Sequence, residues 1–152
     1  MLSGLWQSER GFSLIEVVIV IIIMGIVFSI ASSTWFGAVE SRKVDSATNQ
    51  LVGDLRQAHS MAINRLVDQT VNLTAGNSEY TLPDGTTVDL DSDLDPNGDI
   101  ISVAANSTIV FKGDGGAVIT GANPITVRVT NNPTNNHTIE INTATSEIKV
   151  VP

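Results

Sequence analysis

One uninterrupted apolar segment near the start of the chain limits what the protein can be more than any other feature does. Within residues 17–31 only Gly25 and Ser29 interrupt the apolar side chains, and no charged residue lies between Glu16 and Glu40. As a helix, these 23 uncharged residues would extend about 35 Å, more than the roughly 30 Å hydrocarbon core of a bilayer. The sequence therefore predicts a single membrane span.

The remaining chain is short and contains no cysteine. Its 152 residues leave room for one modest domain beside the apolar segment. Disulfides, thiolate zinc sites, cysteine nucleophiles and iron–sulfur clusters all require a sulfur that the chain lacks. These classes of site are excluded.

The second half of the chain is strongly acidic. Residues 76–152 hold 10 acidic side chains but only Lys112, Arg128 and Lys149 as basic ones, so the net charge is 3 − 10 = −7. A surface of that sign repels phosphate groups, which makes binding of nucleic acids or anionic membrane surfaces by this part unfavourable. Cations or basic partners fit it better.

Three interpretations of the apolar segment compete. A plain signal-anchor gives no reason for Glu16, whose carboxylate would cost roughly 2.5–3.5 kcal/mol at mid-bilayer. An ordinary secretory signal peptide would be cut after residues 31–33, but it would carry an acid in its apolar region and Arg10 as its only basic residue before that region. The third interpretation rests on a family resemblance.

Residues 11–16, with the sequence Gly-Phe-Ser-Leu-Ile-Glu, precede a run of seven apolar residues. This segment closely resembles the amino-terminal signature of type IV pilins and type II secretion pseudopilins. The resemblance implies that a membrane peptidase, the prepilin peptidase, cuts between Gly11 and Phe12 and that the new amino terminus of Phe12 is N-methylated. Residues 1–11 would be the leader peptide, and the apolar helix would stay on the mature protein.

The same resemblance gives Glu16 a role in assembly. In a filament of packed apolar helices its carboxylate needs a cation, which the Phe12 amine of a neighbouring subunit would supply. Two features depart from the expected pattern. Ser33 stands where many major pilins have a helix-breaking proline, and Arg42 and Lys43 lie on the presumed outer side, contrary to the positive-inside bias.

The region after the span has the pattern of an amphipathic helix. Residues 40–66 contain no proline, and their apolar side chains recur at spacings of three and four. We expect this face to be covered by a sheet, while Asp45, Asn49, Arg56 and Asn64 form the polar side. The predicted core face comprises Val44, Ala47, Leu51, Leu55, Ala58, Ala62 and Leu66.

After Asp68 the apolar period changes to two, which predicts strands. The breaks between them are rich in Gly, Asn, Asp and Pro. The sequence thus predicts an α+β fold, with a long N-terminal helix packed against an antiparallel β-sheet head. We expect a membrane half of the helix over 12–34, an amphipathic half over 35–68 and a β-rich head over 69–152. The expected strands cover residues 71–74, 80–82, 87–90, 100–104, 108–111, 117–120, 125–130, 138–141 and 147–151.

Parts of the later region narrow the resemblance. Residues 51–58 and 62–65, and the stretch from Ile109 to Gly116, resemble the helix and strands of FimT and of H-type minor pseudopilins. This implies a minor pilin or pseudopilin that helps to initiate or cap a filament. Its partners would be other pilin or pseudopilin subunits, the prepilin peptidase and an inner-membrane assembly platform. It would lie in the inner membrane with a single span and a periplasmic or extracellular head.

Other functions remain open at this stage. A major pilin would differ from a minor one in its abundance in the filament. A minor pilin for DNA uptake is opposed by the acidic head, and a secreted soluble binding protein would require cleavage by signal peptidase.

Catalysis has few candidate groups. His59 and His137 are the only histidines, and neither a nucleophile elbow nor a phosphate-binding glycine loop is present. We expect His59 to be solvated or half-buried, and residues 113–116 to form a turn. The chain is therefore predicted not to be an enzyme, and no catalytic residue is assigned.

An acidic stretch suggests a metal site. Asp93, Asp95, Asn97 and Asp99 occupy positions one, three, five and seven of a loop similar to an EF-hand, with glycine at position six. However, Ala104 stands at position twelve, where a glutamate would complete the calcium ligands. A calcium site and a simple Pro-Asn-Gly turn both remain possible interpretations, and no other cofactor is expected.

Overall fold

The computed structural model describes residues 12–90, 101–130 and 132–151, except for the side chains of residues 32–37 and 133. The chain divides into two compact units, Met1–Ala38 and Val39–Pro152. The first holds the apolar segment, and the second is a head that contains all nine strands of the described chain. The predicted α+β class is confirmed.

A single helix, α1 (Leu14–Arg65), contributes to both units. In the first unit it starts directly after Ser13, whose carbonyl accepts hydrogen bonds from the amides of Glu16 at 3.0 Å and Val17 at 3.3 Å. The side chains from Leu14 to Ile30 are apolar with few exceptions, and they are exposed on all faces of the helix. This part of α1 has no core of its own.

In the second unit α1 is amphipathic, as predicted. Six of the seven expected core residues, from Val44 to Ala62, are buried, and the four expected polar positions are exposed. The prediction was wrong for Leu66, which is 78% exposed. Leu66 lies one residue beyond the helix with a positive φ of 53°, so its side chain leaves the helical face.

The helix ends in a Schellman motif. The amide of Leu66 donates to the carbonyl of Ile63 at 3.4 Å, and the amide of Val67 donates to that of Ala62 at 3.3 Å. A leucine occupies the left-handed position that glycine usually takes, so no glycine marks the end of the helix in the sequence. The chain then turns into the first strand.

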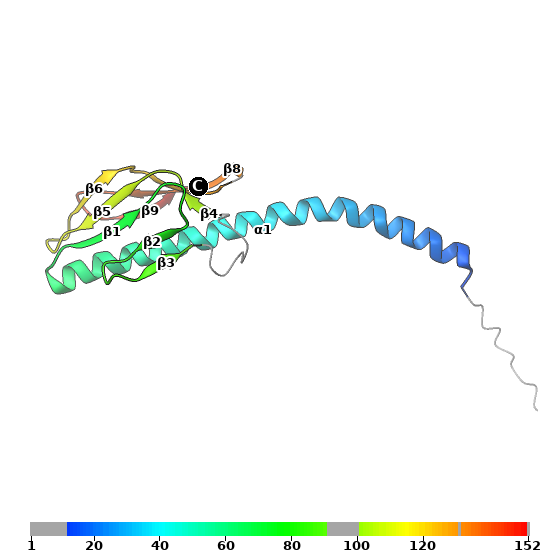
Figure 1. Ribbon diagram of the computed structural model, residues 1–152, viewed down its shortest axis with the longest axis horizontal. Helices are drawn as coiled ribbons and strands as arrows, with labels where there is room; N and C mark the ends of the chain where they lie inside the picture. Colours follow the sequence, from blue (N-terminus) through cyan, green and yellow to red (C-terminus); the bar gives the residue numbers. More distant parts are fainter. Residues whose placement is uncertain (1–11, 91–100, 131, 152) are drawn as a thin grey trace, which may run out of the picture. The chain divides into compact units, whose positions relative to one another are not determined.

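Five strands form the first sheet, in the order β3-β2-β1-β5-β6 (Figure 1), and every pair is antiparallel. Alternate residues of β1 and β5 are buried, and Val71 pairs with Ile109 at the centre. The period-two pattern thus directs one face of the sheet to the core. The strands are β1 (Gln69–Leu73), β2 (Glu79–Thr81), β3 (Thr87–Asp89), β5 (Ser107–Phe111) and β6 (Ala117–Gly121).

The other four strands form a second antiparallel sheet, in the order β4-β7-β8-β9. The strands are β4 (Ile101–Val103), β7 (Ile125–Val129), β8 (Asn132–Ile141) and β9 (Ile148–Val151). All nine predicted strands are found, but β8 begins at Asn132, six residues before the predicted start at 138. The predicted break between the strands at 125–130 and 138–141 is therefore wrong for Asn132 and the residues that follow it.

Tertiary hydrogen bonds explain the early start of β8. The Asn132 side chain donates to the Glu40 carboxylate at 3.3 Å, and the Asn135 side chain donates to the Ser41 hydroxyl at 3.4 Å. The register between β7 and β8 also shifts near Arg128 and Val129, which accommodates the extra residues. Residues with turn propensity are therefore held in a strand by contacts with α1.

The core of the head joins the helix to both sheets. Leu51 and Leu55 of α1, Phe111 of β5 and Ile139 of β8 are fully buried and belong to one apolar cluster. Because this cluster draws on α1 and both sheets, each of these elements is needed to exclude water from the others. The prediction that sheet covers the helix is confirmed.

Candidate functional site

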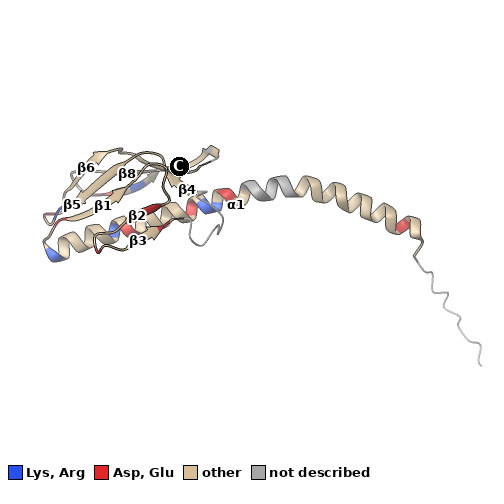
Figure 2. Cartoon of the chain, in the orientation of Figure 1, with Lys and Arg blue, Asp and Glu red and all other residues tan. Residues whose placement is uncertain are grey.

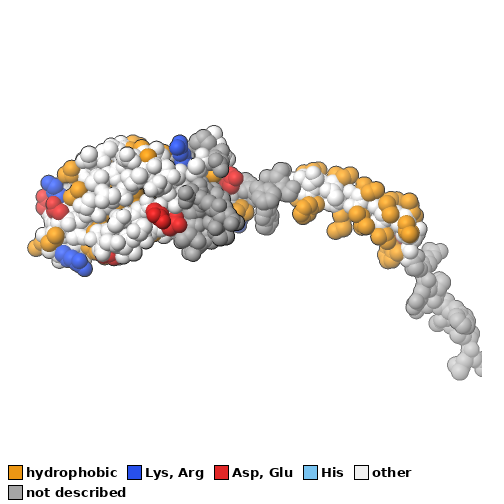
Figure 3. All heavy atoms as spheres, viewed as in Figure 1, with side chains coloured by type: hydrophobic (Ala, Val, Ile, Leu, Met, Phe, Trp, Pro, Cys, Tyr) orange, Lys and Arg blue, Asp and Glu red, His pale blue; other side chains and the backbone are white. Residues whose placement is uncertain are grey.

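The apolar part of α1 is the first candidate site. Leu14–Ala31 has a mean hydropathy of 3.0, and none of it is buried against the rest of the described chain (Figure 3). Ile21 is 63% exposed and Phe28 is 76% exposed. By length and composition this segment is able to cross a membrane. Such a surface is stable only when lipid or other apolar helices cover it.

Glu16 lies in the first turn of this segment and is the only charged residue between Phe12 and Val39 (Figure 2). Within the described residues it forms no ion pair. A shallow recess next to it is lined by the apolar side chains of Phe12, Val17, Val20 and Ile21. The carboxylate therefore lies at the border of an apolar surface and has no cation in its own chain as far as the structure describes it.

The position of Glu16 at the start of the helix also has a purely structural interpretation. Because α1 begins at Leu14, Ser13 is the N-cap and Glu16 is the third helical residue, the spacing of a capping box. This pattern can be seen in the sequence as Ser-x-x-Glu, although the family signature alone does not draw attention to it. Any test of Glu16 must therefore separate the effect of its charge from the effect of its position in the first turn of the helix.

The predicted processing site lies partly outside the described residues. Gly11 is not described, whereas the side chain of Phe12 is 82% exposed just before the helix. Cleavage between these residues and methylation of Phe12 therefore stay predictions.

In the head, polar contacts fasten α1 to both sheets. The Tyr80 hydroxyl of β2 donates to the Asp54 carboxylate, and the Arg56 side chain donates to the Ile148 carbonyl of β9 at 3.3 Å. The Nε2 atom of His137 in β8 lies 2.6 Å from the Oδ1 atom of Asp45. Burial of Tyr80, together with its hydrogen bond to Asp54, raises the pKa of its hydroxyl well above the usual range. These contacts join α1 to β2 of the first sheet and to β8 and β9 of the second.

The polar groups of the head do not assemble a catalytic centre among the described residues. His59 is half-buried, as predicted, and its ring lies 5.4 Å from that of Phe111. His137 is occupied by its contact with Asp45. Residues 113–116 form the predicted turn between β5 and β6, with Gly115 at a positive φ of 95°.

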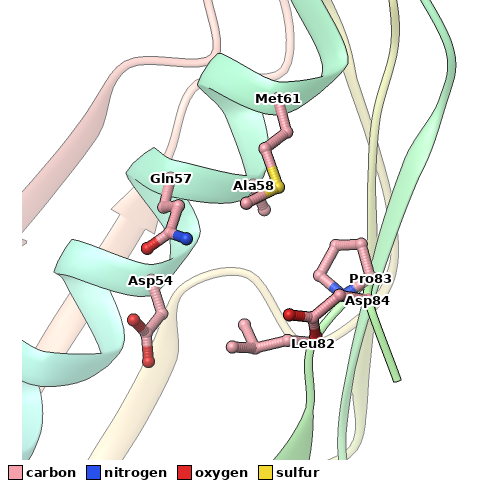
Figure 4. A pocket seen from close by; sticks show the side chains of 7 residues that line it. All are labelled: Asp54, Gln57, Ala58, Met61, Leu82, Pro83 and Asp84. Carbon is pink, nitrogen blue, oxygen red and sulfur yellow. The ribbon is translucent and has the colours of Figure 1, made fainter. Parts of the chain in front are cut away.

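A small pocket between α1 and the segment after β2 also lacks catalytic groups (Figure 4). Asp54, Gln57 and Met61 from the helix face Leu82 and its neighbours across this pocket. Its two carboxylates are already in use, because Asp54 accepts the hydrogen bond from Tyr80 and Asp84 accepts one from the Thr86 amide at 2.9 Å. That backbone hydrogen bond lowers the pKa of Asp84. No nucleophile stands beside a free base within this lining.

The predicted calcium ligands Asp93, Asp95, Asn97 and Asp99 lie outside the described residues. Among the residues that are described, no group of three acidic or histidine side chains could hold a metal ion. The calcium site therefore stays a prediction.

Two comparisons with known families identify the chain. Residues 47–145 match the family described as Type II transport protein GspH, and residues 6–32 match the prokaryotic N-terminal methylation motif. No curated protein and no solved structure matches significantly. The first match covers most of the head, and the second includes Gly11, Phe12 and Glu16. The chain therefore belongs to the GspH family and is a minor pseudopilin or pilin subunit, a membrane-anchored structural component of type II secretion or type IV pilus systems.

Proposed function

We propose that this chain is a non-enzymatic minor subunit that initiates or caps a pseudopilus or pilus. The observation that carries the proposal is a methylation motif on an exposed apolar helix that contains one acidic residue. Residues 12–34 would anchor the chain in the inner membrane, with the head on the periplasmic or extracellular side. The net charge of −7 over residues 76–152 argues against nucleic acid as the partner of the head.

Processing comes first in this proposal. The prepilin peptidase would remove residues 1–11, and the new amine of Phe12 would then be methylated. A small residue at position 11 lets an extended backbone enter a protease site, and Phe12 stands at the exposed start of the helix. Cleavage thus creates a positive charge four residues before Glu16.

Assembly would then use that charge. Glu16 borders an apolar recess and has no ion pair in the described chain. When apolar helices pack around it, its carboxylate loses water and needs a cation. The Phe12 amine of a neighbouring subunit would supply that cation. At 4 Å and an effective dielectric constant near 20, such a pair attracts by about 4 kcal/mol before desolvation is counted. Other pilin or pseudopilin subunits and the assembly platform would be the partners.

Substitution at residues 13 and 16 tests whether the charge matters. The full chain is expressed together with its secretion or pilus system, and incorporation is measured by crosslinking to neighbouring subunits. Glutamine can still occupy the third position of a capping box but carries no charge. We therefore expect Glu16→Gln to reduce crosslinking about tenfold or more, the effect of losing roughly 1.4 kcal/mol. Ser13→Ala, which weakens the cap but keeps the charge, should crosslink almost normally.

The opposite pattern would contradict the proposed role of Glu16. If Glu16→Gln crosslinks like the wild type while Ser13→Ala fails, then Glu16 serves only to start the helix. The intact mass of the membrane-extracted protein tests processing independently. It should show the loss of residues 1–11 and the gain of one methyl group, whereas a mature terminus near residue 34 would indicate an ordinary signal peptide and overturn the proposal.

A further inference from the structure

The outer edge of the first sheet is an open β-strand. Strand β6 pairs with β5 on one side and has no neighbouring strand on the other among the described residues. Its five residues, Ala-Val-Ile-Thr-Gly, include neither a charged residue nor a proline. Val118 and Thr120 point to the exposed face of the sheet, and Val118 is 45% exposed. Figure 1 shows β6 at the margin of the head.

The register of the hairpin shows which backbone groups face outward. At the turn, the backbone amide of Lys112 donates to the Gly116 carbonyl at 2.8 Å. The backbone amide of Gly115 donates to the Lys112 carbonyl at 3.0 Å. This is a type I turn followed by a glycine bulge, so Lys112 and Gly116 form a hydrogen-bonded pair. Because such pairs alternate along an antiparallel ladder, Val118 and Thr120 bond to β5, whereas Ala117, Ile119 and Gly121 direct their amides and carbonyls away from it.

One hydrogen bond confirms that the backbone groups of Ala117 face away from β5. The Ala117 amide donates to the Thr143 carbonyl at 3.0 Å, on the side away from β5. Beyond this point the Ala117 carbonyl, both backbone groups of Ile119 and the Gly121 amide form no hydrogen bond within the described chain. The outer edge of β6 therefore offers a short row of donors and acceptors.

The other three sheet edges are protected. Strand β3 is only three residues long and carries Asp89. On β4, the Val103 amide donates to the Asn77 carbonyl at 3.2 Å, and the Val103 carbonyl accepts from the Gly76 amide at 2.9 Å. Strand β9 carries Lys149, which pairs with Glu147. Short length, covering loops and charges are the usual devices that prevent edge-to-edge pairing, and β6 has none of them beyond its first residue.

We propose that the free edge of β6 binds an extended strand of another protein chain, which adds to the sheet antiparallel to β6. The residue of the partner strand that faces Ile119 would exchange backbone hydrogen bonds with it. A neighbouring residue of the partner strand would place an apolar or β-branched side chain beside Val118. This proposal requires only a folded head, and it does not depend on how the amino terminus is processed.

Charge decides between a different chain and a second copy. Residues 76–152 carry a net charge of −7, so two copies brought together at this edge would repel each other. The five residues of β6 are uncharged, so they add no electrostatic repulsion against an incoming strand. The partner strand should accordingly be apolar in its centre and basic, not acidic, at its flanks.

Peptide binding to the isotope-labelled full chain in detergent micelles tests the proposal. The probe is a synthetic peptide with the β5 sequence, Ser-Thr-Ile-Val-Phe, flanked by two lysines at each end, and its twin has glutamates at those positions. We expect the lysine-flanked peptide to slow hydrogen exchange at the amides of Ile119 and Gly121, and to bind more tightly than the twin. Val118→Lys should weaken this binding about tenfold, because a charge would stand where an apolar neighbour is needed.

A matched control separates edge pairing from general attraction to the acidic head. Thr70 lies on the exposed face of the same sheet, but in the central strand β1, so Thr70→Lys adds an equal charge away from the edge. It should leave binding unchanged. Equal weakening by both variants, protection at β9 instead of β6, or no protection at millimolar peptide would overturn the proposal. Protection of Ile119 that needs no peptide and rises with protein concentration would show pairing between copies, and it would overturn the assignment to a different chain.

Discussion

The two parts of α1 differ in how their apolar side chains are arranged and covered. From Leu14 to Ala31 the helix is apolar on every side and is exposed. From Val44 to Ala62 the apolar residues follow one face and are buried by the sheets of the head, while the opposite side carries residues such as Asp45 and Arg56. The amphipathic part is complete within its own chain, but the first part requires lipid or neighbouring helices.

This difference predicts whether a substitution in α1 should change the stability of the head or the assembly of subunits. A side chain in the amphipathic part contributes to the folding of the head, because its neighbours are the head's own strands. A side chain in the apolar part meets partners only in the membrane or the filament. Folding of the head and assembly should therefore respond to different halves of one helix.

The largest effect is expected from a leucine in the buried half. Leu55 is fully buried, so Leu55→Ala removes apolar contacts and leaves a cavity that should lower the free energy of unfolding of the head by about 3 kcal/mol. Ile22, which is 57% exposed, lies outside the buried cluster of the described residues. Urea unfolding of the full chain in detergent, followed by the far-ultraviolet signal of the head, measures both.

Ile22→Ala is the matched control for that measurement. It should leave the urea midpoint of the head unchanged, since no residue of the head packs on the apolar segment in the described core cluster. A comparable loss of stability in both variants would contradict the division of α1 into a self-sufficient part and a partner-dependent part.

Local pattern predicted the buried half well but not where it ends. Spacings of three and four identified Val44, Leu51 and Leu55 as core residues because an α-helix places such positions on one face. The same spacing also included Leu66, since the Schellman motif that ends the helix uses a leucine and not a glycine. The early start of β8 was missed for a similar reason, because the contacts of Asn132 and Asn135 with α1 are tertiary.

The candidate site shows a comparable split. Gly11, Phe12 and Glu16 could be proposed from the sequence, because a processing signal is a local motif of neighbouring residues, and their roles stay predictions. The open edge of β6 could not be identified in this way. The period-two pattern predicts a strand at 117–120, but only the sheet order shows that β6 lies at an edge and that its hydrogen bonds leave Ile119 facing outward.

A smaller effect is expected from the hydrogen bond between Tyr80 and Asp54, which ties the buried half to β2. Tyr80→Phe removes this bond, and about 1 kcal/mol of stability should be lost at neutral pH. The pKa of Tyr80 in the folded head is raised, chiefly by burial. At pH values above about 10, the unfolded chain releases the tyrosine proton while the folded chain keeps it, so the stability of the wild type falls as pH rises.

Urea unfolding at pH 8 and at pH 10.5 checks that sign. The stability difference between wild type and Tyr80→Phe should narrow at the higher pH, since the variant has no tyrosine left to titrate. Lysines titrate in both proteins and cancel in the comparison. A difference that stays constant or widens would mean that the Tyr80 hydroxyl is not held in its protonated form by the fold.

The smallest effect compares two glycines of α1, Gly25 in the apolar part and Gly53 in the amphipathic part. A Cβ atom added at Gly25 or at Gly53 would meet no other atom within 4 Å among the described residues. An alanine is more favourable than a glycine inside a helix, so Gly53→Ala should stabilise the head by about 0.5–1 kcal/mol, whereas Gly25→Ala should not change its urea midpoint.

In the assembled state, Gly25→Ala should have the larger effect of the two. Small residues allow apolar helices to approach closely in a membrane, so Gly25→Ala should reduce crosslinking to neighbouring subunits if a helix packs there, while Gly53→Ala should crosslink normally. Stabilisation of the head by Gly25→Ala would mean that the apolar half is coupled to the fold of the head after all.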